Sequence, residues 1–440
     1  SRVPAVHTVH NTAEKSLKNA TLVEVERGTA SPDRARWLTG GRIAGIFGSD
    51  QPAPDGVRQI DLRGGFVSPG LVDMHVHLHD IKELSTNLAY GVTMVRNLRG
   101  FPAHLRWRDR VARGDWLGAT IITASPSIAG PESHALNTSV ADAGEARAKV
   151  REYQQRGFDL VKVYGGHSGE VLNALLDEAR RVGIPVAKHA PHAEGLPLEM
   201  IRSAQTLEHV EDIFQGPLNY TFDEDLLRVE AARLADLGVP VVPTLATFDH
   251  LTQLSQHKSA FIQENPIEQI NPFFRSLYRE ASVARWLEAD EEQVTWNVRV
   301  WEFLMIVAQA LDEAGVPLLV GSDAGTMFMT AGLSTHREMQ LMQLAGVSPV
   351  TILRAATLKA AQVLDMADVQ GSVAEGRWAD LVITTNNPLD DVSYLKLPAA
   401  VVKRGQWLGR DDLDAIIQSA GAPSGWFGGV AMLLEHWWKD

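Results

Sequence analysis

Cysteine is absent from this chain of 440 residues. Its absence excludes disulfide bonds, thiolate metal ligands and a cysteine nucleophile. A transition metal in this protein would therefore have to be held by histidine, aspartate, glutamate or a modified lysine. The lack of cysteine is compatible with an oxidising compartment, but many cytosolic proteins also do without it, so it does not fix the location.

Long apolar runs are missing as well. No stretch has the length and hydrophobicity needed to cross a bilayer, and the N-terminal "SRVPAVHTVHNTAEKSLKNA" lacks the apolar core of a signal peptide. We therefore expect a soluble protein that does not associate with membranes. The compartment stays open: cytoplasmic, or periplasmic or secreted if a leader was removed before Ser1.

Basic residues are outnumbered by acidic ones. Lysine and arginine together number 41 against 54 aspartate and glutamate residues, which gives a formal net charge of −13. An acidic surface repels phosphate backbones, so we expect no nucleic-acid partner. With 45% hydrophobic residues the chain can bury a large core, and its length favours one large domain with a smaller companion.

Both ends of the sequence have a β-rich texture. Near the N-terminus, apolar runs such as "ATLVEVERG" and "ARWLTGGRIAGIFG" alternate with glycine and proline turns, and "ADLVITTNNP" repeats this texture late in the chain. No helix-length period lies between these runs, which indicates a small β-sheet module. We predict one composite β-sandwich built from residues 1–67 and 366–410.

The middle, residues 68–365, alternates strand-like runs with helix-like stretches. Eight units of this kind are the pattern of a (β/α)8 barrel, so the predicted fold class is α/β. Two of the intervening helices, "SGEVLNALLDEARRVG" and "DEDLLRVEAARLADLG", have apolar residues at helical spacing and end at glycine. The candidate strands are "LVDMHVHL", "GVTMVRNL", "ATIITASPSI", "LVKVYG", "IPVAKHA", "TLEHVE", "VPVVPTLAT" and "VPLLVGSDAG".

Two further segments stand out. The connection from Phe248 to Ala314, between the seventh and eighth strands, is long enough to be a lid over the barrel, although its helical end favours ordinary packing. The tail, residues 411–440, is apolar and aromatic, so it either packs on its own barrel or forms a subunit interface. Its large aromatic residues are Trp426, Phe427, Trp437 and Trp438.

The stretch "GLVDMHVHLHD" contains three histidines at alternating positions. Residues two apart in a strand face the same way, so His75 and His77 can converge on one ion. His79 shares this parity but lies at or beyond the end of the strand. Taken alone, the pair is explained equally well by a structural or surface role.

Other predicted strands also end in residues that can bind metals. A single buried histidine or aspartate is more often a hydrogen-bonded core residue than a ligand. Five such strand ends on one side of a barrel favour a metal site, because barrel active sites lie at the carboxyl ends of the strands. The additional strand-end residues are Lys162, His189, His209 and Asp323.

Together these motifs resemble the amidohydrolase superfamily, specifically its imidazolonepropionase and prolidase-like branch of binuclear metal-dependent hydrolases. The resemblance runs in family order from about residue 20 to residue 408, and it implies the barrel with a urease-like composite domain. It is carried by "GGFVSPGLVDMHVHL", "GVTMVRN", "FDLVKVYGG", "PVAKHAPH", "TLEHVED", "GVPLLVGSDAG" and "AATLKAAQVLDMADVQGSVAEGRWADLVITTNNPLDD".

The resemblance also implies a ligand set for two divalent metal ions. His75 and His77 would bind the first ion with Asp323, and His189 and His209 would bind the second. Zinc is the default for histidine and carboxylate ligands, with manganese, cobalt and iron as alternatives.

Lys162 would be carboxylated by carbon dioxide and bridge the two ions. A carbamate offers two oxygens, as a carboxylate does, whereas an ammonium group repels cations. The alternative is an unmodified Lys162 paired with an acid.

The implied reaction is hydrolysis. Two ions about 3.5–4 Å apart share a water and lower its pKa, so that hydroxide attacks the substrate carbonyl near neutral pH. Asp323 would accept the proton of this water and pass it to the leaving nitrogen. A serine, threonine or cysteine nucleophile is not needed.

Two residues are candidates for substrate binding. Tyr164 lies on the same side of its strand as Lys162 and can donate to a carbonyl or oxyanion, although packing with the hydroxyl at the surface is an equal alternative. His134, in "AGPESHALN", takes the place of a Gly-Gly-His motif in relatives and could bind a carboxylate or carbonyl.

Other residues near the motifs receive supporting roles. Arg96 and Asn97 match a family stretch that usually reads Arg-Asp, and we expect them to support the ligands or the structure. For His336 we expect a role in helix capping or packing. The expected neighbours of the ligands, outside the ligand positions, are His79, His192 and Asp73.

The predicted substrate is a small linear amide. Members of the branch that open imidazolone rings tend to lack the lysine, so Lys162 favours a dipeptide, an N-acyl amino acid or an amide toxin of similar shape. A cyclic amide, lactone, ester or carbamate remains an alternative, because the same hydroxide attacks each carbonyl. A non-catalytic metal-binding homologue is disfavoured by the full ligand set. Relatives often assemble, so we expect a homo-oligomer.

Overall fold

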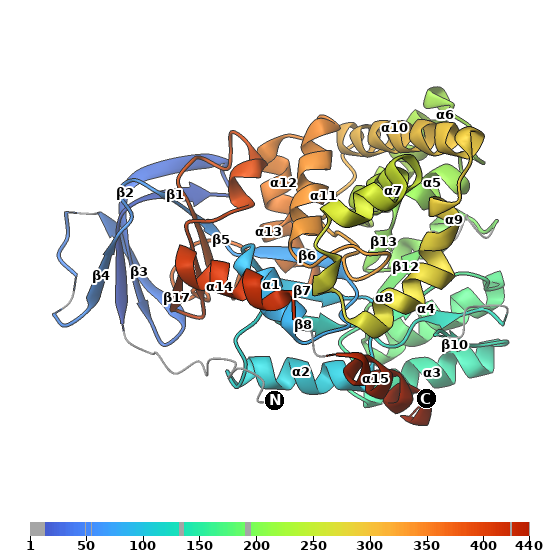
Figure 1. The fold of residues 1–440 in the computed structure, drawn as a ribbon, viewed down its shortest axis with the longest axis horizontal. Coiled ribbons are helices and arrows are strands. Elements are labelled where there is room, and N and C mark those ends of the chain that lie inside the picture. Colours follow the sequence, from blue (N-terminus) through green and yellow to red (C-terminus); the bar gives the residue numbers. More distant parts are fainter. Residues whose placement is uncertain are drawn as a thin grey trace.

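The computed structural model describes residues 14–48, 50–53, 55–131, 136–189, 195–422 and 425–439. The architecture is mixed α/β, which confirms the predicted class. A β-sheet module lies at one end of the molecule, and a larger body of parallel strands and surrounding helices forms the rest (Figure 1).

The β-sheet module combines strands from both parts of the chain. Its order is β17-β16-β15-β5-β1-β2-β3, with β4 paired to β1. The antiparallel pairing of β5 with β15 sets Val67 opposite Ile383 and so joins the two parts. The predicted sandwich and its boundaries stay a prediction. The strands are β1 Lys15–Glu24, β2 Thr29–Thr39, β3 Arg42–Gly48, β4 Arg58–Asp61, β5 Phe66–Pro69, β15 Leu381–Thr384, β16 Ala400–Lys403 and β17 Gln406–Gly409.

The central strands pair in parallel. One sheet has the order β6-β7-β8 and the other β10-β9-β11-β12-β13-β14. A single bridge between Ala124 and Leu160 joins the two sheets at one side. At the other side, residues 318–324 lie between them, because Leu318 pairs with Val241 and Ala324 with Val76. The strands are β6 Leu71–Val76, β7 Val92–Asn97, β8 Thr120–Thr123, β9 Ile128–Ala129, β10 Thr138–Ser139, β11 Val161–Val163, β12 Val186–His189, β13 Thr206–Glu208 and β14 Val241–Val242.

The eighth predicted strand, "VPLLVGSDAG", forms bridges instead of a regular ladder. Its backbone is pressed against β6. A Cβ atom at Gly321 would lie 2.3 Å from Val242 Cγ1 and 2.8 Å from His75 Cβ, and one at Gly325, where φ is +97°, would lie 1.8 Å from the His77 oxygen. Only glycine permits this approach and this φ, and the resulting turn carries Asp323 to the end of β6.

The helices around the parallel strands agree with their sequence signals. The two predicted from sequence are α4 and α6, capped by the side chains of Ser168 and Asp223 and ended by left-handed Gly183 and Gly238. The bounds are α1 Lys82–Ala89, α2 Pro102–Ala112, α3 Ala143–Gln155, α4 Gly169–Val182, η2 Leu198–Ser203, α5 Val210–Gln215, α6 Glu224–Leu237, α11 Leu333–Leu344, α12 Pro349–Ala355, α13 Leu358–Val363 and η5 Val392–Leu395.

The long connection between the seventh and eighth strand segments is helical. It begins with a 20-residue helix and ends with one of 23 residues, and shorter helices lie between them (Figure 1, yellow). Its bounds are α7 Leu245–Glu264, η3 Ile267–Gln269, α8 Pro272–Tyr278, η4 Arg279–Val283, α9 Ala284–Leu287 and α10 Glu291–Glu313. A lid function for this connection stays a prediction.

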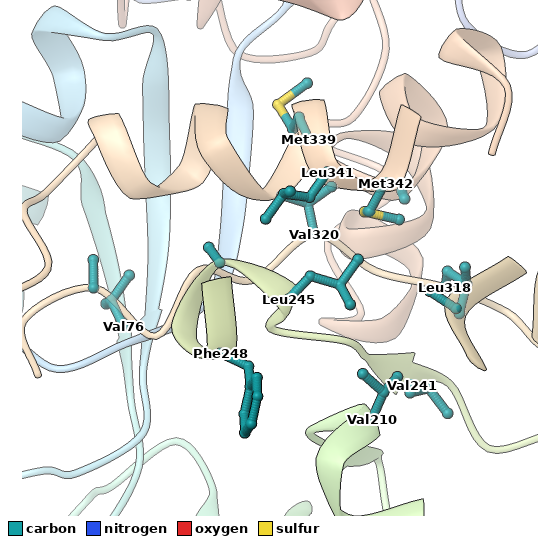
Figure 2. Packing of buried hydrophobic residues seen from close by; sticks show 14 of the residues in the cluster. Val76, Val210, Val241, Leu245, Phe248, Leu318, Val320, Met339, Leu341 and Met342 are labelled. Carbon is teal, nitrogen blue, oxygen red and sulfur yellow. The ribbon is translucent and has the colours of Figure 1, made fainter. Parts of the chain in front are cut away.

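The main hydrophobic core lies between the parallel strands and their helices. Figure 2 shows the part of it where the start of α7 meets α11 and residues 318–320. Full burial of an aliphatic side chain contributes about 1.5–3 kcal/mol, so this cluster fixes α7 and the Asp323 segment together. The labelled residues are Val76, Val210, Val241, Leu245, Phe248, Leu318, Val320, Met339, Leu341 and Met342.

The C-terminal tail packs on its own chain. Helix α14 (Arg410–Ala420) contacts α1, and α15 (Trp426–Lys439) contacts α2 and α8. Arg106 of α2 forms an ion pair with Glu435, while Phe427 and Trp438 are 87% and 90% exposed. The tail therefore packs on its own chain and presents an apolar outer face, and a subunit interface there stays a prediction. Among the described residues, no helix has the length and hydrophobicity of a membrane span.

A buried ion pair fastens the β-sheet module to the parallel strands. Lys403 Nζ donates to Asp380 Oδ2 at 2.7 Å, to the Thr93 oxygen at 2.8 Å and to Thr120 Oγ1 at 2.8 Å. Thr93 belongs to β7 and Thr120 to β8. The lysine thus links the two parts of the fold.

We predict that Lys403→Met lowers the free energy of unfolding by about 3 kcal/mol, because it leaves a buried carboxylate without its main cation. The matched control is Arg27→Met, which removes the cation of the exposed pair with Glu24 and should cost less than about 1 kcal/mol. Denaturant unfolding measures both. Equal losses in the two variants would contradict the proposed fastening role.

Candidate metal centre

Three predicted ligands form a buried group that could hold a metal ion. One ligand atom each of His75, His77 and Asp323 lies within 4.8 Å of the others. Asp323 Oδ1 lies 2.8 Å from His77 Nε2 and 3.4 Å from His75 Nε2. The backbone holds this arrangement, because the Asp323 amide donates to the His75 oxygen at 2.7 Å.

The other two predicted histidines extend this group. The rings of His75 and His209 have centroids 4.7 Å apart, and those of His209 and His189 are 4.4 Å apart. β12 ends at His189, which pairs with Glu208 at the end of β13, and His209 follows directly. Four histidines from three strand ends therefore stand side by side.

Lys162 lies in β11 with its side chain 1% exposed. Its Nζ has no hydrogen-bond partner in the described part of the chain. Burial lowers its pKa to about 8, and its charge in turn helps to lower the pKa values of His75 and His189. The alternative in which Lys162 pairs with an acid is therefore not what the described residues show.

A hydrogen-bond partner fixes the ring of three of the four histidines. In each case Nδ1 contacts an oxygen, so that Nε2 keeps its lone pair for a metal. None of these partners was identified from sequence. The pairs are His75 with Glu208 (2.7 Å), His189 with Asp212 (3.0 Å) and His209 with Thr244 (2.7 Å).

Glu208 is the most deeply buried of these three partners. It is fully buried and accepts from Arg96 Nη2 at 2.9 Å and from Thr206 Oγ1 at 2.5 Å. Burial alone would raise its pKa, but the charges of Arg96 and Lys162 lower it below the ordinary value. The sequence contains one signal that could have identified Glu208: a carboxylate within an apolar strand, directly before His209.

The charge states of the group suit a metal. Burial, as the main cause, lowers the pKa of His75, His77 and His189 and takes that of His209 to about 4. Burial would raise the pKa of Asp323, but the neighbouring histidines lower it below its usual range. Neutral imidazoles and an ionised carboxylate are the forms that bind divalent cations. Asp323 Oδ1 faces Nε2 of both His77 and His75, at 2.8 and 3.4 Å, so this donor set fits a metal.

Two ligand positions have strained backbones. Asp323 and His209 have φ values of 57° and 69°, in the left-handed region that non-glycine residues seldom occupy. Such strain gathers at functional sites, where the surrounding structure enforces it.

Asp73 has a structural role. It accepts hydrogen bonds from the His75 amide, from the amide and hydroxyl of Ser322 and from the Thr335 hydroxyl, at 2.6–3.0 Å. Its carboxylate therefore clamps β6 to the segment that carries Asp323, as expected for a neighbour of the ligands.

The remaining predicted residues take varied positions. His79 Nε2 lies 3.1 Å from the Tyr278 hydroxyl, and His79 is not one of the three grouped ligands. The Tyr164 ring lies 4.3 Å from that of His189. His336 donates to the Tyr90 oxygen and so has a packing role. His134 and His192 lie outside the described residues.

Comparison with known proteins identifies the family. The family model described as Amidohydrolase family matches residues 66–408. The chain is 24% identical over 413 residues to the imidazolonepropionase of Vibrio vulnificus, covering 86% of this chain and 93% of that protein. The chain belongs to the amidohydrolase family, which supports a hydrolase that acts on C–N bonds.

Solved structures give the same result. A bottromycin amidohydrolase has a TM-score of 0.76 and 28% identity, with 94% of this chain and 91% of that chain covered. A putative prolidase from Bifidobacterium longum has a TM-score of 0.69 and 24% identity, with 93% and 99% covered. These neighbours imply an α/β fold of the TIM-barrel type.

We predict that Glu208→Gln weakens metal binding by about 10- to 100-fold, because the amide holds His75 less strongly in the tautomer that binds metal. Chelator competition measures the affinity. The matched control is Glu178→Gln, which changes an equally buried glutamate on α4 that pairs with Arg181 outside the site. The prediction is wrong if both variants bind metal as the unmodified chain does.

Proposed function

We propose that this protein is a binuclear metal-dependent amidohydrolase that cleaves the amide bond of a small substrate of the dipeptide or N-acyl amino acid type. One observation carries the proposal: His75, His77 and Asp323 converge beside the rings of His209 and His189. The similarity to proteins described as a prolidase and as a bottromycin amidohydrolase supports it.

We also propose the finer architecture. The bridges between Ala124 and Leu160, Val241 and Leu318, and Val76 and Ala324 are the contacts by which parallel strands would close into a (β/α)8 barrel over residues 68–365. Residues 1–67 and 366–410 would form the companion sandwich. The active site would lie at the carboxyl ends of the strands.

The ligand assignment follows from the positions of the side chains. His75 and His77 would hold one ion with Asp323, and His189 and His209 the other. Lys162, as a carbamate, would bridge them, and zinc is the expected metal. When bound, two such ions polarise the substrate carbonyl and supply hydroxide near neutral pH.

The chain itself would move the proton. Asp323 is ionised, and its Oδ2 accepts from Thr247 Oγ1 at 3.3 Å, while Oδ1 faces the histidines. It would accept the proton of the attacking water and deliver it to the leaving nitrogen. Tyr164, beside His189, would donate to the carbonyl oxygen, and His134 is the second proposed substrate residue.

The alternatives differ in the bond attacked. A cyclic amide is favoured by the similarity to imidazolonepropionase, and a lactone, ester or carbamate has a comparable carbonyl. A non-catalytic homologue would bind metal without turnover. A panel of dipeptides, N-acyl amino acids, cyclic amides, lactones, esters and carbamates, assayed with zinc-loaded protein, separates these possibilities.

We predict that chelation abolishes amide hydrolysis and that zinc restores it. Asp323→Asn should retain at least one ion and lower kcat by about 100- to 10,000-fold, the usual contribution of a general acid or base. Metal analysis and steady-state kinetics test this. Turnover near that of the unmodified chain with metal retained would exclude the proton-transfer role.

Lys162→Met should lose the second ion and most of the activity. Bicarbonate should speed zinc reconstitution of the unmodified chain, since carbon dioxide supplies the bridging carbamate, but should not affect the variant. Metal stoichiometry during reconstitution, with and without bicarbonate, is the measurement. If the unmodified chain binds two ions equally fast with and without bicarbonate, carboxylation of Lys162 is contradicted.

The predicted homo-oligomer also remains a proposal. Large exposed apolar patches mark interaction sites, and the outer face of α15 offers Phe427, Leu434 and Trp438.

A further inference from the structure

Arg99 is a cation beside the segment that carries His77, and the proposed mechanism does not use it. It follows β7 by two residues, and Asn97, the last residue of β7, pairs with Val76 in β6. Asn97 Nδ2 donates to the Arg99 oxygen, and Asn97 Oδ1 accepts from the Leu78 amide. The Arg99 backbone is thus fixed beside the segment that carries His77.

The Arg99 guanidinium has no carboxylate partner among the residues that the structure describes. The side chain is partly buried, and its buried Nε has no hydrogen-bond acceptor within the described part of the chain. Arg96, the neighbouring arginine, is saturated by Glu208, Thr206 and the Met74 oxygen. A guanidinium nitrogen that is buried without an acceptor carries a desolvation cost that a bound anion would relieve.

Tyr278, at the end of α8, lies next to Arg99. Its hydroxyl contacts His79 Nε2 at 3.1 Å and also receives a hydrogen bond from Arg99. Burial raises the pKa of Tyr278 to about 12 although the Arg99 charge opposes this, so the hydroxyl stays neutral. The long connection therefore contributes a polar group to the same place.

Arg99 lies beside the segment that leads from β6 into the metal group. The Leu98 amide donates to the Val76 oxygen at 2.9 Å, and the Tyr278 hydroxyl lies 3.1 Å from Nε2 of His79, two residues after His77. His77 is a proposed ligand, and Tyr164 lies against His189 on the other side. A substrate whose amide lies over the ions would thus have this cation within reach.

We propose that Arg99, with the Tyr278 hydroxyl, binds a carboxylate of the substrate and so selects amides that carry a free acid near the scissile bond. Guanidinium and carboxylate form paired hydrogen bonds of the strong, charge-assisted kind. In a dipeptide or N-acyl amino acid the carboxylate is only three bonds from the scissile carbonyl carbon. This inference rests on the proposed function for its substrate class.

Three related amides distinguish where the carboxylate lies. N-acetyl-L-proline carries it on the amine side, succinyl pyrrolidide carries it on the acyl side, and N-acetylpyrrolidine lacks it. We expect zinc-loaded protein to prefer one of the two acids over N-acetylpyrrolidine by about 10- to 100-fold in kcat/KM. The preferred acid identifies the side.

Arg99→Met should abolish this preference and leave the metal content unchanged, while Arg99→Lys should retain part of it. Tyr278→Phe should reduce the preference less. The control is Arg106→Met, whose arginine pairs with Glu435 outside the site, and it should keep the full preference. Retention of the preference in Arg99→Met would overturn the proposal.

Binding separates this inference from the proposed function. The three compounds are titrated calorimetrically into zinc-treated Asp323→Asn protein, with and without Arg99→Met. Tighter binding of an acid that depends on Arg99 supports the carboxylate site even if nothing in the panel is hydrolysed, in which case only the proposed function fails. Equal binding of all three compounds, or no binding, overturns the carboxylate site.

Discussion

The close contact between β6 and residues 321–325 is the constraint on which the rest of the site depends. Glycine at 321 and 325 lets the two backbones approach more closely than any side chain would permit. Asp73 clamps the same contact through Ser322. As a result, the strained Asp323 is held within hydrogen-bonding distance of His77, and a carboxylate and two imidazoles share one small volume.

Burial then sets the chemistry of this volume. Removing histidines from water favours their neutral form, and the oxygens of Glu208, Asp212 and Thr244 orient three of the four rings. The same burial disfavours a charged Lys162, whose Nζ has no hydrogen-bond partner in the described part of the chain. A protein interior that holds so many unpaired polar atoms without a ligand is costly, and bound cations would relieve that cost.

Much of the fold was readable from the sequence because local signals agreed with it. Caps and terminal glycines predict α4 and α6, and alternation predicts β6 with His75 and His77 on one side. The eighth strand was read as regular, yet it forms single bridges, because glycine contacts at 321 and 325 replace ladder pairing. The connection after β14 was read as a candidate lid with a helical end, and the structure shows long helices, α7 and α10, at its two ends.

The sequence by itself determined the family and the set of ligand-type residues at strand ends, because these follow from motifs and from the two-residue period of strands. It could not reveal the partners that orient them or the contact of Arg99 with Tyr278. Most of those pairs join residues that lie 35 to 179 positions apart in the sequence. The pair of His189 and Asp212 is closer in sequence, but it joins the end of a strand to a helix. Only the packing of the parallel strands against α8 and one another decides which of these polar groups meet, since side-chain contact depends on the three-dimensional register of the elements.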